Sequence, residues 1–117
     1  MKTIMIVDDE PDNITIIKTV LESHKYNVIS AVNGDDCLEK LKNGAKPDLI
    51  LMDIMMPGTP IRDVIKKIKN IKIVYLTVVR MIEAEKQGLL GQKNVVGYIQ
   101  KPFDINELLK EVKKITG

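Results

Sequence analysis

LILMDIMMPG, residues Leu49–Gly58, runs from four apolar residues directly into an aspartate. Four apolar residues in a row are too few for a buried helix and are typical of a short strand that is covered on both faces. Such strands occur in parallel sheets, because the helices that connect the strands pack on both sides of the sheet. Asp53 follows this strand directly, and Pro57 and Gly58 then indicate a loop. The stretch therefore predicts a parallel α/β sheet with a carboxylate at the end of one strand.

The same pattern recurs on both sides of this stretch. Further short apolar runs, rich in β-branched residues, lie at Thr3–Val7, Val28–Val32, Ile73–Leu76 and Val95–Ile99. The segments between them have helical spacing, which is clearest in the stripe formed by Ile105, Leu108, Leu109, Val112 and Ile115. Five strands that alternate with helices predict right-handed crossovers and a doubly wound parallel sheet.

Several helix ends can be assigned from capping residues. Asp104 precedes the last apolar stripe and Glu107 stands three residues later, which is the pattern of an N-cap and its N3 partner. Asn33 is expected to cap the second helix, and Gly44 is expected to end it. The segment 80–92 is a weaker helix candidate, because two glycines interrupt it.

Length and composition indicate one globular domain. The chain has 117 residues, of which 44% are hydrophobic and 29% charged, and its formal net charge is +2. This charge is too small to indicate nucleic acid or an anionic membrane as a partner. The single cysteine, Cys37, excludes an internal disulfide, and we expect a half-buried thiol rather than a redox site. No signal peptide or membrane-spanning stretch is present, so we expect a cytoplasmic domain.

Two lysine-rich stretches are spaced like solvated helix faces. They consist of Lys66, Lys67, Lys69 and Lys72, and of Lys110, Lys113 and Lys114. No aromatic residues alternate with these lysines, although single-stranded nucleic acids are commonly bound by such stacking platforms. We therefore expect no direct binding of nucleic acid.

Polar side chains follow every predicted strand except the second. Asp8 and Asp9 follow the first strand, Asp53 the third, Thr77 the fourth and Lys101 the fifth. In doubly wound sheets, functional groups gather beyond the carboxyl ends of the strands. Converging carboxylates repel one another, and a hard divalent cation such as Mg²⁺, together with a lysine, removes this penalty. A carboxylate nucleophile beside a metal and a lysine is suited to phosphoryl transfer onto an aspartate.

Three segments resemble the receiver domains of two-component response regulators, including the chemotaxis regulators. They are Ile4–Pro11 (IMIVDDEP), Leu49–Gly58 (LILMDIMMPG) and Tyr98–Phe103 (YIQKPF). The resemblance covers the whole chain, residues 1–117. It implies a flavodoxin-like fold with strand order 2-1-3-4-5 and helices on both faces. It also implies a phosphoprotein in signal transduction that accepts a phosphoryl group from a histidine kinase or a histidine phosphotransfer protein.

The resemblance further assigns the residues of the reaction. Asp53 resembles the phosphoacceptor, which would form an aspartyl phosphate. Asp8 and Asp9 resemble the acidic pair that holds Mg²⁺, and the backbone carbonyl of Met55 resembles a further ligand. Mg²⁺ is the only cofactor that the resemblance to receiver domains implies.

Three residues resemble the groups that respond to phosphorylation. Thr77 resembles the switch hydroxyl that moves toward the phosphoryl group, and Lys101 resembles the lysine that pairs with its oxygens. Tyr98 resembles the aromatic residue that turns between outward and inward orientations. The resemblance also implies a cis peptide bond between Lys101 and Pro102.

Three segments depart from the family pattern. Pro60 and Ile61 occupy a region in which receivers usually carry a glycine, so we expect a stiffer loop. The connection Asn70–Lys72 is shorter than usual, and the segment Gly88–Asn94 lacks the usual Gly-Ala turn. The fourth helix, the fifth strand and the fifth helix form the common output surface of the family. The target and any phosphorylation-dependent homodimer therefore stay open.

Two other functions compete with this reading. A phosphatase of the haloacid dehalogenase kind needs a second aspartate two residues after its nucleophile, and this chain has Met55 there. A pseudo-receiver would act as an interaction module without phosphorylation, although all the reactive positions are filled.

We expect a signalling domain that catalyses only its own phosphorylation and dephosphorylation. It would be either a stand-alone receiver or a part excised from a longer protein.

Overall fold

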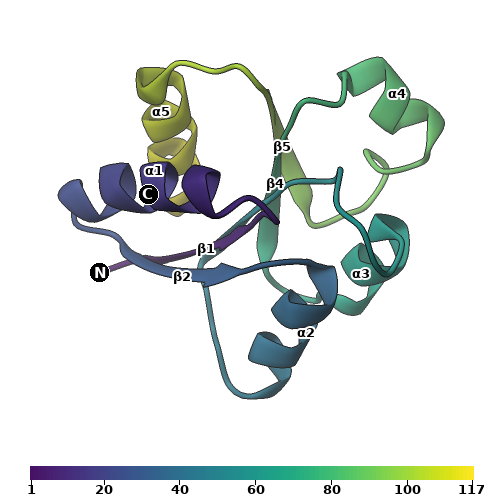
Figure 1. The fold of residues 1–117 in the computed structure, drawn as a ribbon, viewed down its shortest axis with the longest axis horizontal. Helices are drawn as coiled ribbons and strands as arrows, with labels where there is room; N and C mark the ends of the chain where they lie inside the picture. The colour runs from purple at the N-terminus through teal and green to yellow at the C-terminus, as the bar shows by residue number, and fades with distance from the viewer.

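The computed structural model describes all 117 residues and contains one five-stranded parallel sheet (Figure 1). Its strand order is β2-β1-β3-β4-β5, which confirms the predicted doubly wound, flavodoxin-like topology. The strands are β1 (Thr3–Val7), β2 (Asn27–Ala31), β3 (Leu49–Met52), β4 (Lys72–Thr77) and β5 (Val95–Gln100). The helices are α1 (Pro11–Ser23), α2 (Gly34–Lys42), α3 (Ile61–Lys67), α4 (Met81–Lys86) and α5 (Ile105–Thr116).

The helices cover both faces of the sheet, as the apolar strands predicted. Figure 1 shows α1 and α5 on one face, and α2, α3 and α4 on the other. Successive side chains of a strand point to opposite faces, so each strand contributes to two cores. In β3, Leu49 and Leu51 pack with α1 and α5, whereas Ile50 and Met52 pack under the other three helices.

The helix ends largely follow the predicted caps. The Asn33 side chain accepts a hydrogen bond from the Asp36 backbone N–H at 2.7 Å, and Gly44 follows α2 with a φ of +106°. Asp104 caps α5 by accepting from the N–H of Asn106 at 2.7 Å rather than from Glu107. None of the helices has the length and apolarity that crossing a membrane requires.

Three sequence expectations need correction. Strand β2 starts and ends one residue earlier than predicted, at Asn27–Ala31. Helix α3 ends at Lys67, so Lys69 and Lys72 lie in the following turn and strand rather than on a helix face. Cys37 is fully buried rather than half-buried, and burial raises the pKa of its thiol to about 12. A protonated, inaccessible thiol is unreactive, which agrees with the expectation of no redox site.

Strand β5 contains a bulge near its start. Ile73 of β4 pairs with Val95, but the next residue, Val74, pairs with Gly97. Val96 is therefore an extra residue with no partner in the ladder. Bulges are rare in parallel pairs, but bulges in general are over-represented at sheet edges, where they redirect a side chain.

Candidate functional site

Two buried carboxylates lie side by side at the carboxyl end of the sheet. β1 and β3 are neighbours, and their last residues, Val7 and Met52, are opposite each other in register. Asp8 and Asp53 follow these two residues, and the N–H of Asp53 donates to the carbonyl of Val7 at 3.0 Å. Only 2% of Asp8 and 8% of Asp53 is exposed. Parallel pairing therefore brings together two acids that are distant in the sequence.

The amine of Lys101 joins these carboxylates. Its Nζ lies 3.0 Å from Oδ2 of Asp8 and 3.1 Å from Oδ2 of Asp53. The side chain reaches them from the end of β5, where the N–H of Lys101 donates to the carbonyl of Thr77 at 2.8 Å. The peptide bond between Lys101 and Pro102 is cis, as expected. One ammonium thus forms ion pairs with two carboxylates, and the three side chains together carry a net negative charge.

The protonation of Lys101 reflects this environment. Burial opposes the charge of the ammonium, but the hydrogen bonds and negative charges of Asp8 and Asp53 outweigh burial. The pKa of Lys101 is therefore raised above the ordinary lysine value of 10.5. The lysine stays positively charged throughout the physiological pH range.

The other oxygens of the two carboxylates are held by backbone and hydroxyl groups. Oδ1 of Asp8 accepts from the N–H of Glu10 at 2.9 Å. Oδ1 of Asp53 accepts from the N–H of Met55 and from the hydroxyl of Thr77, both at 2.9 Å. No buried polar side-chain atom of the molecule lacks a hydrogen-bond partner. Oδ2 of Asp53, by contrast, accepts only from Lys101.

A series of hydrogen bonds leads from Asp53 to the edge strand β5. The hydroxyl of Thr77 donates to Asp53 and accepts from the N–H of Val79 at 3.3 Å. The carbonyl of Val79 in turn accepts from the hydroxyl of Tyr98. The ring of Tyr98 packs edge-on against Tyr75, with 6.0 Å between the ring centroids. Tyr98 is thus turned inward, and burial followed by the charge of Asp53 raises the pKa of its phenol.

Sequence reasoning did not identify two members of this region. Val79 takes part through its backbone, so its side chain gives no signal. Tyr75 lies in an apolar strand, so the sequence predicts only that it belongs to the core. Its hydroxyl nevertheless donates to the carbonyl of Leu89 at 2.8 Å. This buried bond ties β4 to the segment after α4, and burial raises the pKa of Tyr75 to about 12. A tyrosine in an otherwise aliphatic strand was the only available sign.

The comparisons with known proteins decide the family. The family model of the response regulator receiver domain matches residues 4–113. The chain belongs to this family. The receiver domains of response regulators are signalling domains of two-component systems, and they receive a phosphoryl group from histidine kinases.

Relatives of this receiver domain include proteins of two lengths. It is 33% identical to the alkaline phosphatase synthesis transcriptional regulatory protein PhoP of Bacillus subtilis, over 97% of this chain and 48% of PhoP. The chain therefore spans about half the length of that relative. It is also 32% identical to protein PilH of Pseudomonas aeruginosa, over 98% of both chains.

A solved structure shows the same fold. The response regulator TrrA of Thermotoga maritima, in complex with Mg²⁺-BeF, has a TM-score of 0.81 and 34% identity with this receiver domain. The match covers 98% of this chain and 99% of TrrA. Mg²⁺-BeF is the ligand of TrrA in that structure.

The predicted metal ligands of the receiver domain do not all converge. Asp8 and Asp53 share Lys101, but Asp9 is exposed and makes no hydrogen bond or salt bridge through its side chain. No three acidic, histidine or cysteine side chains are grouped closely enough to hold a metal by themselves. The carbonyl of Met55 accepts no hydrogen bond from within the chain, so it is available as a ligand. The available donors are all oxygen atoms, which suits Mg²⁺.

Proposed function

We propose that this receiver domain accepts a phosphoryl group on Asp53 and changes its surface in response. The donor would be a phosphohistidine of a sensor histidine kinase or of a histidine phosphotransfer protein. The observation that supports this proposal is the shared position of the Lys101 amine, 3.0 Å from Asp8 and 3.1 Å from Asp53. An amine placed there pairs with the carboxylate of Asp53 and can also pair with the oxygens of an incoming phosphoryl group.

The residues present fit a magnesium ion. Mg²⁺ prefers oxygen ligands and is usually held by one or two carboxylates together with water. Asp8 and Asp53, with the carbonyl of Met55, would provide such a set, and Asp9 is the additional carboxylate nearest in sequence. When bound, Mg²⁺ would neutralise charge on the phosphoryl group during transfer. The two buried carboxylates exceed the charge of Lys101 by one, so they also favour a cation electrostatically.

The transfer itself needs one free oxygen on Asp53. Oδ1 accepts from two donors, whereas Oδ2 contacts only the amine of Lys101. We therefore assign Oδ2 as the attacking atom. The bond from Oδ2 to phosphorus forms as the bond from phosphorus to the imidazole nitrogen of the donor breaks. Lys101 keeps its proton and moves with the phosphoryl oxygens, which spreads the charge of the transition state.

The response would run through Thr77 and Tyr98. The Thr77 hydroxyl already points to Asp53, and Tyr98 is already turned inward through Val79. A phosphoryl group on Asp53 would offer Thr77 a more highly charged acceptor and so favour this arrangement over an outward one. A ligand shifts such an equilibrium only through contacts that differ between the two states. We assign that role to the contacts of Thr77 and Lys101.

Two alternatives are less well supported. A pseudo-receiver needs no reactive site, but here the carboxylates and the lysine are buried in direct contact. A phosphatase of the haloacid dehalogenase kind needs an acid at position 55, where this chain has a methionine.

We further propose a cytoplasmic location, a protein target without direct contact to nucleic acid or membrane, and homodimer formation that depends on phosphorylation.

Mass spectrometry of the intact protein tests the proposal. The protein is incubated with acetyl phosphate and Mg²⁺, and we expect a mass increase of one phosphoryl group that is lost in Asp53→Asn. Asp63→Asn is the matched control, because Asp63 is an exposed acid on α3. Omission of Mg²⁺ should also abolish the increase. Phosphorylation of Asp53→Asn, or none of the wild type, would overturn the proposal in favour of another site or of a pseudo-receiver.

A further inference from the structure

Charge is separated between the two ends of the sheet. Every helix starts near the carboxyl end of a strand, and each has an acid in its first turn: Asp12, Asp35 and Asp36, Asp63, Glu83, and Glu107. Four helices have lysines in the last turn: Lys40 and Lys42, Lys66 and Lys67, Lys86, and Lys113 and Lys114. This distribution complements the helix dipoles. It concentrates positive charge at the amino end of the sheet, opposite Asp53.

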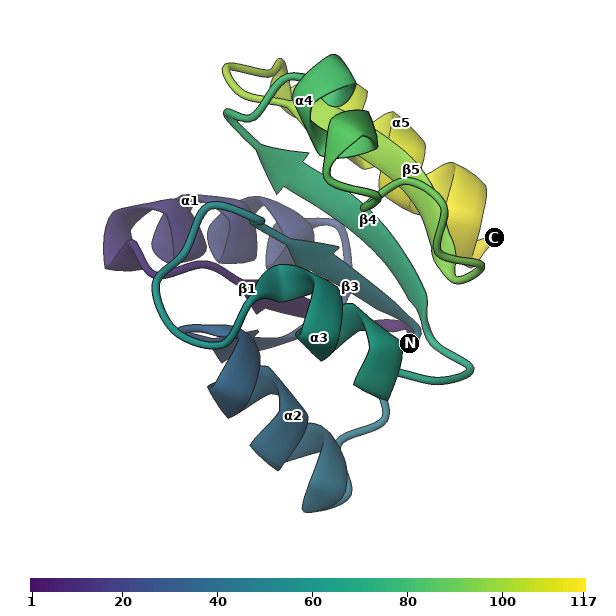
Figure 2. The same ribbon diagram turned by 90° about the vertical axis from the view of Figure 1, so that its right-hand side faces the viewer.

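A hollow of about 610 Å³ lies at this amino end. We call it the amino-end hollow and define it by Lys69, Ile71, Lys72, Lys93 and Val96, which line it. Its walls are the turn from α3 to β4 and the segment that leads into β5, which lie at the right of Figure 2. Its volume is within the range of ligand-binding clefts. It is far in the sheet from the phosphoacceptor, since it lies where the strands begin.

The walls of the amino-end hollow are fixed by hydrogen bonds. The side-chain amide of Asn94 donates to the carbonyls of Ile68 and Ile71, at 3.0 and 3.3 Å. The backbone carbonyl of Asn94 accepts from the N–H of Ile73 at 2.9 Å. Asn70 takes a left-handed conformation with a φ of 63°, which turns the chain tightly between these points. A rigid cleft loses less entropy when it binds a partner.

The bulge in β5 places an apolar side chain in this hollow. Val96 has no partner in the ladder, and 44% of it is exposed although valine is apolar. In a regular strand, Val96 would pair with Val74, and the residues after it would point to the opposite faces of the sheet from those they point to here. Val96 lines the hollow together with the three lysines, and we call the surface formed by Val96 and Ile71 its apolar floor.

The charges around this floor have no partners. No carboxylate lines the amino-end hollow, and Lys69, Lys72 and Lys93 form no salt bridge. An apolar floor with three unpaired cations around it is complementary to a segment that has an apolar side chain between carboxylates. The concave shape and the lysines without arginine or aromatic residues fit a flat membrane or stacked bases less well.

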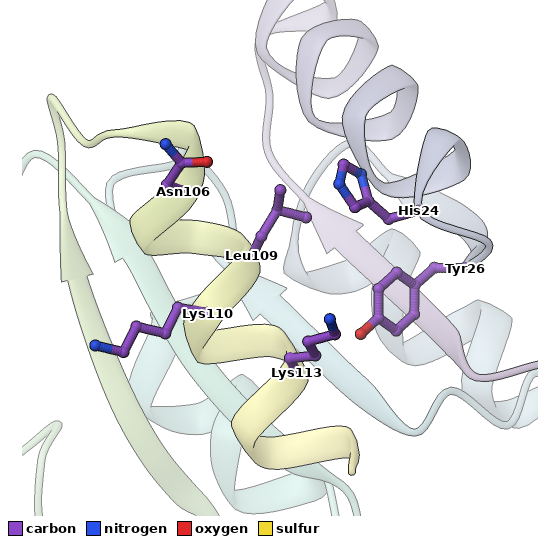
Figure 3. Close-up of a pocket in the computed structure, with 6 residues that line it drawn as sticks. All are labelled: His24, Tyr26, Asn106, Leu109, Lys110 and Lys113. Carbon is purple, nitrogen blue, oxygen red and sulfur yellow. The ribbon is translucent and has the colours of Figure 1, made fainter.

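A second basic hollow, shown in Figure 3, gives a useful contrast. It has about 410 Å³ and lies between α5 and the turn after α1. Leu109 and Lys113 point toward His24 and Tyr26, whereas Lys110 extends to the other side of α5. Its cations are thus spread around the helix rather than gathered over one floor. The second hollow is lined by two lysines and the amino-end hollow by three, and the two sets are arranged differently.

We propose that the amino-end hollow binds an acidic segment of a partner protein. Carboxylates of the segment pair with Lys69, Lys72 and Lys93, and an apolar side chain between them covers Val96 and Ile71. This interaction does not depend on phosphorylation of Asp53, because it uses none of the residues of that site. It would hold a partner at the end of the domain opposite the phosphoacceptor.

Fluorescence anisotropy tests this proposal with a short labelled peptide in which aspartate and glutamate alternate with leucine. We expect the wild-type protein to bind it, and the variant Lys69→Gln/Lys72→Gln/Lys93→Gln to bind roughly tenfold more weakly. The matched control is Lys110→Gln/Lys113→Gln/Lys114→Gln, which removes the same charge from α5, outside the amino-end hollow, and should bind within about twofold of the wild type. Val96→Asp should abolish binding, because it places a carboxylate on the floor.

Several results would overturn the proposal. Equal losses in the two lysine variants would show general attraction by the basic end of the molecule. Tighter binding of single-stranded RNA or of phosphatidylglycerol vesicles than of the peptide would identify another class of partner. Failure of the peptide to bind at millimolar protein concentration would also exclude the interaction. Circular dichroism shows whether each variant is folded, and this measurement does not depend on the function proposed for Asp53.

Discussion

At the end of the sheet where the strands finish, the side chain of Lys101 is only 14% exposed and contacts two buried carboxylates. At the end where the strands begin, Lys69, Lys72 and Lys93 are exposed and form no salt bridge. Lys101 and these three lysines have the same ammonium group but different surroundings. Charges interact more strongly when they are removed from water, so Lys101 is expected to affect stability and chemistry far more than the exposed lysines. The exposed lysines remain available to a partner.

The largest expected effect tests the buried end. Lys101→Met should lower the free energy of unfolding by about 3 kcal/mol without divalent cations, because it leaves two carboxylates buried without a counter-charge. Mg²⁺ should restore part of this loss by replacing the ammonium. Urea unfolding, with a chelator and then with Mg²⁺, measures both changes. The exposed control Lys114→Met should change stability by less than about 0.5 kcal/mol, and an equal loss in both variants would remove the distinction between the two ends.

A smaller loss is expected for Thr77→Val. The substitution keeps the shape of the side chain but removes the hydroxyl that donates to Asp53 and accepts from Val79. Loss of a hydrogen bond to a charged, buried acceptor should cost about 1.5 kcal/mol in urea unfolding. Thr15→Val is the control on the exposed face of α1 and should be nearly neutral. If the two variants are equally stable, the contact between Thr77 and Asp53 contributes nothing.

The pKa of Lys101 tests the balance at the buried end more finely. We expect Asp8→Asn to lower this pKa, because burial continues to oppose the charge while one hydrogen bond and one negative charge are lost. The folded-state pKa lies above 10.5, so the stabilisation is fully present below that pH and is lost as the pH rises through the folded-state value. NMR titration of the Lys101 side chain measures the pKa. Asp63→Asn should leave it unchanged, and a rise in Asp8→Asn would contradict the assignment.

The smallest effect is expected at the amino end of the sheet. Lys69→Gln/Lys72→Gln/Lys93→Gln should change the free energy of unfolding by less than about 1 kcal/mol, toward greater stability, because exposed like charges repel only weakly. Urea unfolding at low salt detects the change, and high salt should reduce it. A loss of several kcal/mol would show that these lysines have structural partners.

The sequence predicted the sheet and the site residues because their signals are local. The apolar runs of β1 and β3 and the caps at Asn33 and Asp104 each depend on neighbouring residues. The carboxyl ends of parallel strands must meet, so contact between Asp8, Asp53 and Lys101 follows from the fold class once the strands are assigned.

Other features depend on packing that the sequence does not show. Asp8 and Asp9 are adjacent and chemically identical, but successive residues after a strand point in different directions, so one is buried and the other exposed. Cys37 is fully buried because α2 packs closely against the sheet. The carbonyl of Val79 connects Thr77 to Tyr98 through backbone atoms that every residue has. The roles of the metal ligands and of the phosphoacceptor stay predictions until the proposed experiments are done.

The extra residue in β5 has a consequence for how this strand tolerates shortening. Val96 is the one position that the ladder with β4 does not use. If it were deleted, Val95 and Gly97 would become consecutive, and Gly97 to Gln100 could keep their present partners. A deletion between Gly97 and Gln100 would instead turn the amine of Lys101 away from its carboxylates. Length variation in this strand is therefore compatible with the buried lysine only at the bulge.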